Sequence, residues 1–259
     1  MMHLLRNARG MRVAIDAHDA SVRAWWAPDR YGRLADVLGA APPAARSSTG
    51  WRCDPPDDGK LLLHLAQDGL SVRLAYRLDD DGSLHLDCVA TADTVYRFAL
   101  AAPRFNLQGG RVAVGDHVLR LAADHYRPGP WPGGCAGDAA FDVAGSAFDF
   151  RQPAPLASRL AWPARAQSAG FRHDFYWTGS GQLREAARVA DPASGRVLRF
   201  SSTQDSCHLY SDARCFSLLA QGVQLQPGQV RRFQLAYRLG VQDLDAFDIS
   251  EAVSMMSNK

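Results

Sequence analysis

The sequence predicts an all-β fold of antiparallel sheets with little helix, and three observations support this prediction. Apolar and polar side chains alternate over several stretches, and turn-forming residues interrupt these stretches at intervals of about ten residues. Before the tail, no stretch has a spacing that favours a helix over a strand. Many short strands separated by such turns are typical of a sandwich or a barrel.

The clearest prediction is a hairpin over 71–90. The turn sequence DDDG separates two alternating stretches. Their apolar positions are Val72, Leu74, Tyr76 and Leu78 before the turn, and Leu84, Leu86, Cys88 and Ala90 after it.

Later elements follow the same pattern. The stretch RRFQLAYRLG places Phe233, Leu235, Tyr237 and Leu239 on one face. The stretch LREAARVA has helix propensity, but it lies between the turn sequences TGSGQ and DPASGR, so a strand is predicted there. We expect one domain over 1–259, with Pro/Gly-rich loops at 39–50 and 127–137 and a helical tail at 242–259.

Composition excludes several classes of function. The net charge is +2 with basic residues dispersed, which argues against a nucleic-acid partner. No apolar run approaches the ~18 residues of a membrane helix, and the N-terminus does not resemble a secretory signal. The cysteines are odd in number and lack CxxC spacing, so we expect free thiols in a reducing cytoplasm and no metal site. They are Cys53, Cys88, Cys135, Cys207 and Cys215.

The stretch AAPRFNLQGG, residues 101–110, draws attention because it follows a predicted strand. Proline has no N–H to donate, so the strand must leave its ladder at Pro103. Strand exits are where β proteins place binding residues. Arg104 and Asn106 are therefore candidate ligand-binding residues.

Three stretches together resemble the aldose 1-epimerase (galactose mutarotase) family. They are RVAIDAHDASVRAWWAPDRYGRLADVLG near the N-terminus, the central RFNLQGG…DHVLRLAADHYRP…VAGSAFDFRQP, and GFRHDFYW…ARVADPASGRVLRFSSTQDSCHLYS. Their order and spacing span most of residues 11–240. The resemblance implies a galactose-mutarotase-like β-sandwich (supersandwich) whose broad face binds a small sugar, a hexose or a derivative, without metal or cofactor.

The family's reaction opens a sugar ring with a glutamate base and a histidine acid. By resemblance, the acid falls on Ala102 and the base on Gln229. The family's aspartate falls on Arg172. The family's remaining histidine and arginine belong to a segment that is missing here, where 39–50 stands. The only glutamates, Glu185 and Glu251, are predicted in a hairpin strand and in the tail, where neither is well placed to replace the base.

The surviving candidates have a functional and a structural interpretation. His173 is the candidate catalytic residue, or it is a histidine hydrogen-bonded inside the sandwich. Arg104 and Arg172 could bind a carboxylate or a phosphate, or they are solvated arginines at the rim of the site. The predicted carbohydrate-binding set is Arg104, Asn106, Arg172, His173 and Gln229. Trp131 could stack on a sugar or close the edge of the sandwich.

Three functions remain open at this stage. The first is a carbohydrate-binding protein in which the acid and base are missing and mutarotation is weak or absent. The second is an active aldose 1-epimerase, an isomerase of hexose anomers, that works through a rebuilt site. The third is an interaction module without a sugar ligand.

Overall fold

The computed structural model describes residues 1–39, 50–55, 59–110, 113–129, 139–159, 170–179 and 181–241. Within these residues the strands pair antiparallel, and the one helix is a single turn, α1 (Leu156–Arg159). The all-β prediction is therefore confirmed. No helix among the described residues is long and apolar enough to cross a membrane.

The largest sheet has nine strands and forms the floor of the molecule. Its order is β13 (Ala154–Pro155), β10 (Val118–Leu121), β15 (Arg184–Ala190), β16 (Arg196–Ser202), β20 (Arg231–Val241), β8 (Ser83–Ala92), β7 (Leu70–Leu78), β6 (Lys60–Gln67) and β5 (Trp51–Cys53). The predicted hairpin is β7 and β8, and all eight of its apolar positions are buried. The strand predicted over LREAARVA is β15, and the one over RRFQLAYRLG is β20.

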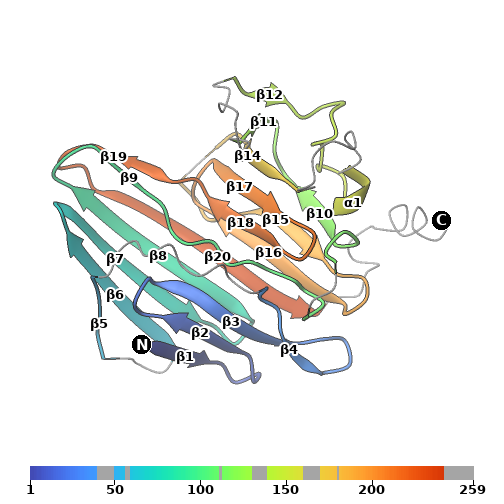
Figure 1. The fold of residues 1–259 in the computed structure, drawn as a ribbon, viewed down its shortest axis with the longest axis horizontal. Coiled ribbons are helices and arrows are strands. Elements are labelled where there is room, and N and C mark those ends of the chain that lie inside the picture. Colours follow the sequence, from blue (N-terminus) through green and yellow to red (C-terminus); the bar gives the residue numbers. More distant parts are fainter. Residues whose placement is uncertain are drawn as a thin grey trace.

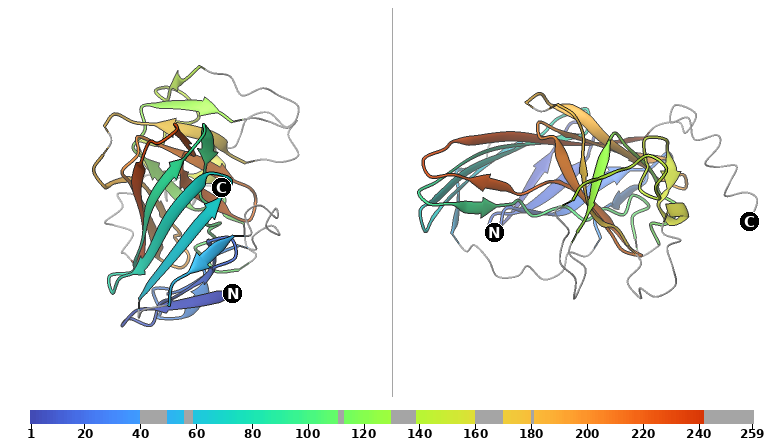
Figure 2. Two further views of the ribbon diagram at one scale, coloured as in Figure 1. Left: turned by 90° about the vertical axis from the view of Figure 1, so that its left-hand side faces the viewer. Right: turned by 90° about the horizontal axis from the view of Figure 1, so that it is seen from above.

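Three smaller sheets lie against this floor. One consists of β1 (Met2–Arg6), β2 (Arg12–Asp16), β3 (Ser21–Pro28) and β4 (Leu34–Asp36). A five-stranded sheet has the order β12 (Phe141–Asp142), β11 (His125–Pro128), β14 (Arg172–Tyr176), β17 (Ser206–Ser211) and β18 (Phe216–Ala220). The third pairs β19 (Val223–Leu225) with β9 (Tyr96–Phe98). Figure 1 shows β3 in front of β8 and β20, with β17 and β18 in front of β16, and Figure 2 gives the side views.

Phe105, from the RFNL stretch, joins these sheets in the core. Its ring is fully buried and lies 6.2 Å from that of Trp25 on β3, 5.7 Å from Phe216 on β18 and 5.6 Å from Tyr237 on β20. Aromatic pairs at such separations stabilise a core beyond the area that they bury. The segment that carries Arg104 is therefore fixed to three sheets.

Arg196, from the DPASGR turn, fixes the end of the same segment. Its buried guanidinium donates to the backbone carbonyls of Leu107 and Gln108, and to those of Ala27 and Arg33 in the β3–β4 hairpin. Burial lowers the pKa of Arg196 from its usual value, but the carbonyls satisfy the donors. The resemblance at DPASGR thus marks a structural anchor.

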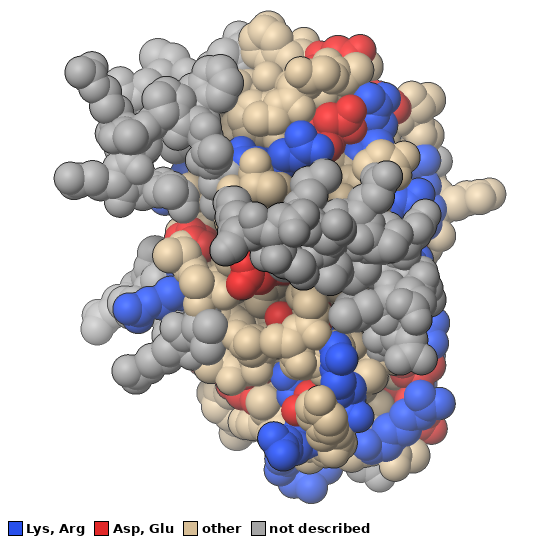
Figure 3. All heavy atoms as spheres, turned by 90° about the vertical axis from the view of Figure 1, so that its right-hand side faces the viewer, with Lys and Arg blue, Asp and Glu red and all other residues tan. Residues whose placement is uncertain are grey.

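Several predictions fall outside the described residues: Trp131, the loop at 40–49, the tail at 242–259 and, with it, Glu251. Of the cysteines, Cys53, Cys88, Cys207 and Cys215 are free thiols, and Cys135 is not described. On the face drawn in Figure 3, basic and acidic side chains are interspersed over the coloured part of the surface. That part carries no continuous basic stripe.

Candidate functional site

The five-stranded sheet has two unlike faces because side chains alternate along its strands. On β14, His173 and Phe175 are buried, whereas Arg172, Asp174 and Tyr176 point to the other, partly exposed face. We call this second surface the polar face. It consists of Arg127 on β11, Arg172, Asp174 and Tyr176 on β14, His208 and Tyr210 on β17, and the side chains of Arg104, Asp212 and Gln221 that reach onto it.

Asp174 is the centre of the polar face. Register places it opposite Arg127 on one side and His208 on the other. Its Oδ2 accepts from Arg127 Nη2 at 3.0 Å, and its Oδ1 lies 2.8 Å from His208 Nδ1. Burial alone would raise the pKa of Asp174, but the hydrogen bonds from His208 and Arg127 outweigh burial and lower it. The carboxyl is therefore ionised near neutral pH and orients the imidazole.

Two arginines share one tyrosine ring at the Arg172 end of the polar face. The guanidinium carbon of Arg172 lies 5.2 Å from the Tyr210 ring centroid, and that of Arg104 lies 5.1 Å from it. Arg104 also forms an ion pair with Asp212 through Nη2 and donates from Nε to Cys215 Sγ at 2.9 Å. Cation–π contacts of this kind hold planar guanidinium groups in place.

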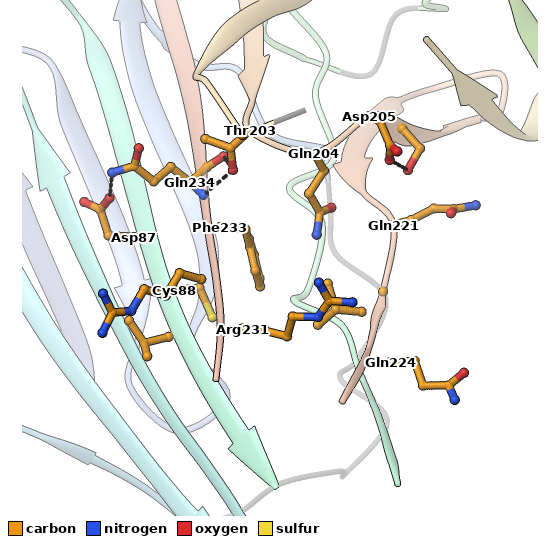
Figure 4. Close-up of a pocket in the computed structure, with 16 residues that line it drawn as sticks. Asp87, Cys88, Thr203, Gln204, Asp205, Gln221, Gln224, Arg231, Phe233 and Gln234 are labelled. Carbon is orange, nitrogen blue, oxygen red and sulfur yellow. Dashed lines mark hydrogen bonds between the residues drawn. The ribbon is translucent and has the colours of Figure 1, made fainter. Parts of the chain in front are cut away.

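A cleft adjoins the opposite end of the polar face. Gln221 donates to the Tyr176 hydroxyl at 2.9 Å and also lines this cleft, which has a volume of about 740 Å³. Figure 4 shows Gln204 pointing into the cleft, between Phe233 and Gln221. The Oε1 atom of Gln204 is buried and accepts no hydrogen bond in the described part of the chain. The cleft thus offers amide groups that suit hydroxyl-rich ligands.

Asn106, predicted to bind carbohydrate, is fully buried in this structure. Its Nδ2 donates to the carbonyl of Arg214 at 2.9 Å, and its backbone N–H donates to that of Val37 at 2.7 Å. Next to it, the N–H of Leu107 donates to Nε2 of buried His117 at 3.0 Å. These bonds position the backbone beside Arg104, so the contribution of Asn106 to the polar face is indirect.

His173, the candidate catalytic residue, lies on the face of β14 opposite to the polar face. It is buried, its ring centroid lies 4.3 Å from that of Phe148, and Nδ1 accepts from the Arg172 backbone N–H at 3.1 Å. Burial, helped by the nearby His208, lowers the pKa of His173 to about 4. In this environment the imidazole is neutral and packs among aromatic rings.

Ala102, on which the resemblance places the family's acid, lies between β9 and the bridge of Phe105 to Phe216. The pairing of β9 with β19 and the bridge between Phe105 and Phe216 have the same register. Extending this register through residues 99–104, which form no ladder, would put Ala102 opposite Leu219. Leu219 in turn lies opposite His208. On that extended register His208 would lie two strands from Ala102, or roughly 10 Å at the usual strand spacing.

Gln229, on which the resemblance places the family's base, is exposed in the turn between β19 and β20, where its N–H donates to the Gln226 carbonyl at 3.0 Å. Glu185, the only described glutamate, lies on β15 and forms ion pairs with Arg188 and Arg199. Neither residue contacts a member of the polar face. No group of three metal-ligating side chains occurs among the described residues.

The sequence interpretation missed His208, Tyr210 and Gln221. The sequence did contain one signal of a polar surface: side chains alternate along β14, so Arg172, Asp174 and Tyr176 share a face. Finding their partners required the register of β14 with β17, which the sequence does not contain.

Comparisons with known proteins agree with this architecture. The family model described as "Aldose 1-epimerase" matches residues 66–236. An aldose 1-epimerase from Escherichia coli is 28% identical over 172 residues, which cover 62% of this chain and 49% of that protein. The human galactose mutarotase is 36% identical over 108 residues, which cover 41% of this chain and 30% of that protein. The chain thus spans about half the length, or less, of the curated relatives it matches.

Solved structures share the fold over nearly the whole chain. A GalM/aldose epimerase homologue from C. elegans has a TM-score of 0.79 at 16% identity, covering 94% of this chain and 99% of that one. A galactose 1-epimerase from Lactobacillus acidophilus has a TM-score of 0.72 at 16% identity, covering 93% and 95%. The fold is therefore that of a galactose-mutarotase-like β-sandwich. Since the family model matches about two thirds of its residues, the chain belongs to the aldose 1-epimerase family.

Proposed function

We propose that this chain is a carbohydrate-binding member of the aldose 1-epimerase family, in which mutarotation is weak or absent. The ligand is a sugar, a hexose or a derivative, bound on the polar face. One observation carries the proposal: Ala102 and Gln229 occupy the positions that the resemblance gives to the acid and the base. Neither side chain exchanges a proton near neutral pH.

The chemistry of ring opening explains why this matters. A base must take the proton of the anomeric hydroxyl while an acid protonates the ring oxygen. A methyl group offers no proton, and an amide is too weak a base for the first step. Removing one general acid or base typically costs ~10²–10⁴-fold in rate. Binding requires neither group, since the polar face supplies amide, carboxylate, imidazole and guanidinium partners for hydroxyls.

The pair Asp174 and His208 favours a second candidate, an epimerase with a rebuilt site. Asp174 holds Nδ1 of a partly exposed imidazole, which lies opposite Leu219 of the neighbouring strand β18. A carboxylate that orients a histidine is a common arrangement for proton transfer. His208 would then serve as the acid or base from a neighbouring strand.

Two measurements on the full chain separate these functions. Isothermal titration with glucose and galactose reports binding, and polarimetry on the freshly dissolved α-anomers reports mutarotation. The proposal expects binding heat with an anomer interconversion rate close to that of buffer. A rate well above buffer that His208→Gln abolishes, while His64→Gln at another partly exposed Asp–His pair preserves it, would establish the second candidate instead.

A double variant tests the missing groups directly. Ala102→His with Gln229→Glu restores both residue types of the family, and a gain in rate over the parent is expected if the two positions can reach one sugar. If no hexose, neutral, acidic or phosphorylated, produces binding heat with the wild type, both functions fail and an interaction module without a sugar ligand takes their place.

A further inference from the structure

We propose that Arg172 and Arg104 bind an anionic group carried by the sugar, so that the ligand is an acidic sugar and not a neutral hexose. The shared chemistry is a carboxylate or a phosphate on an exocyclic carbon. This inference rests on the proposed function and names the substrate class of the same polar face.

Each oxygen of the carboxylates beside the two arginines already has a partner within the protein. Oδ1 of Asp212 accepts from the backbone N–H groups of Arg214 at 2.8 Å and Cys215 at 2.9 Å. Oδ2 of Asp212 accepts from Arg104 and from the Tyr210 hydroxyl. Asp174 is likewise engaged, by Arg127 and His208. No carboxylate on the polar face has an oxygen left without a partner.

Arg172 therefore has no counter-ion among the described residues. In the described part of the chain no carboxylate lies within ion-pair distance of its guanidinium, which lies over the Tyr210 ring. Arg104 uses Nε for Cys215 and Nη2 for Asp212, which leaves Nη1 without an acceptor among the described residues. Arginine has five donors and no acceptor, so these groups need an acceptor from a ligand or from water. An anionic acceptor satisfies them most strongly, because a hydrogen bond between two charged groups is roughly twice as strong as one between neutral groups.

The tyrosine ring pre-organises the two arginines. Both guanidinium groups lie about 5 Å from the Tyr210 centroid, so their orientation is set before a ligand arrives. Pre-organised planar donors lose less entropy when they bind a carboxylate or a phosphate. The two guanidinium groups also repel each other at this ring, and a bound anion between them would reduce that repulsion.

The spacing along β14 fits a sugar that bears its anion outside the ring. Arg172 and Asp174 are two residues apart on the same face, which is roughly 7 Å at the rise of a strand. A pyranose ring over Asp174 and His208 can thus place an exocyclic carboxylate or phosphate beside Arg172. Arg172 also stands where the family resemblance implies an aspartate, so the charge at this position is inverted.

The test is isothermal titration of the full chain with matched sugars. The first series is glucose, glucuronate and glucose 6-phosphate, and the second is galactose, galacturonate and galactose 6-phosphate. Inorganic phosphate is the control for the anion without a sugar. We expect the acidic sugar of at least one series to bind about 10- to 100-fold more tightly than the neutral one, as a charge-assisted contact provides. The uronate and phosphate arms identify which anion is preferred.

Variants assign the effect to the arginines. Arg172→Gln should remove the preference for the acidic sugar while weak binding of the neutral sugar remains, and Arg172→Asp should invert the preference. Arg73→Gln, on an exposed position of β7, is the matched control and should change nothing. Thermal unfolding of each variant verifies that it is folded.

Three results would overturn this inference. Equal affinity for neutral and acidic sugars contradicts it and leaves carbohydrate binding intact. Inorganic phosphate binding as tightly as the sugar phosphate would show an anion site without sugar recognition. Absence of binding by every sugar, neutral or acidic, would remove the proposed function together with it.

Discussion

The two faces of the five-stranded sheet differ sharply although they share the same strands. On one face His173 and Phe175 are packed among aromatic rings. On the other, Asp174 meets Arg127 from β11 and His208 from β17, and Arg172 lies over the Tyr210 ring of β17. Neighbouring residues of one strand therefore have opposite environments. The histidine that stands out in the sequence is on the structural face, and the histidine in a hydrogen-bonded pair, His208, is on the polar face.

The largest expected effect concerns the aromatic face. Phe175→Ala removes a fully buried ring that faces Tyr126 and His173. We expect the free energy of unfolding to fall by about 3–5 kcal/mol, because the lost transfer energy and the cavity add. Urea denaturation measures it. A loss below about 1 kcal/mol would mean that the two faces do not differ as described.

The second-largest effect is the contribution of His173 to the pH dependence of the free energy of unfolding. Burial lowers its pKa to about 4, whereas the unfolded chain titrates near 6.5. The unfolded state therefore binds a proton that the folded state does not, and stability falls as the pH drops from 6.5 to 4.

His173→Gln keeps a side-chain acceptor for the Arg172 N–H and removes this titration. Over the window from pH 6.5 to 4, the wild type should lose on the order of 2 kcal/mol more than the variant. Urea midpoints at several pH values provide the comparison, with Phe148→Leu as a control in the same cluster. Parallel pH profiles for wild type and His173→Gln would refute the buried neutral imidazole.

A smaller effect is expected at Asp174. Asp174→Asn keeps the shape but weakens the bonds to Arg127 and His208, and should cost about 1–2 kcal/mol near neutral pH. The lowered pKa of Asp174 gives stability that is present above its unfolded value near 3.9 and is lost as the pH falls through the folded value. The acid limb of the variant's stability profile should accordingly be flatter, and an unchanged acid limb would contradict this account.

The smallest effect on stability is expected at Arg172. Its side chain is partly exposed and stacks on Tyr210 without an ion pair among the described residues. Arg172→Gln should change the free energy of unfolding by less than about 0.5 kcal/mol. Thermal denaturation of Arg172→Gln and Phe175→Ala, measured side by side, compares the stability that each face contributes. A loss comparable with that of Phe175→Ala would make Arg172 a structural residue.

Much of the fold could be predicted from the sequence because strand side chains alternate locally. The period of two identified β7, β8 and β20, and flanking turn residues identified β15 despite its helix propensity. The RFNL and DPASGR stretches identified the family because Phe105 and Arg196 make anchoring contacts that belong to the fold. The sequence also determined that Ala102 and Gln229 lack a group for proton transfer.

The candidate site was less predictable because its parts come from separate strands. Alternation divides β14 into two sets of residues, but it does not say which set faces the core, and only packing decided that His173 is buried. Register decided that Asp174 meets His208 and Arg127, residues 34 and 47 positions away. Arg104 and Arg172 meet at Tyr210 for the same reason. Local propensity acts over a few residues, whereas the hydrogen-bonded ladders and the core that join distant strands exist only in the folded chain.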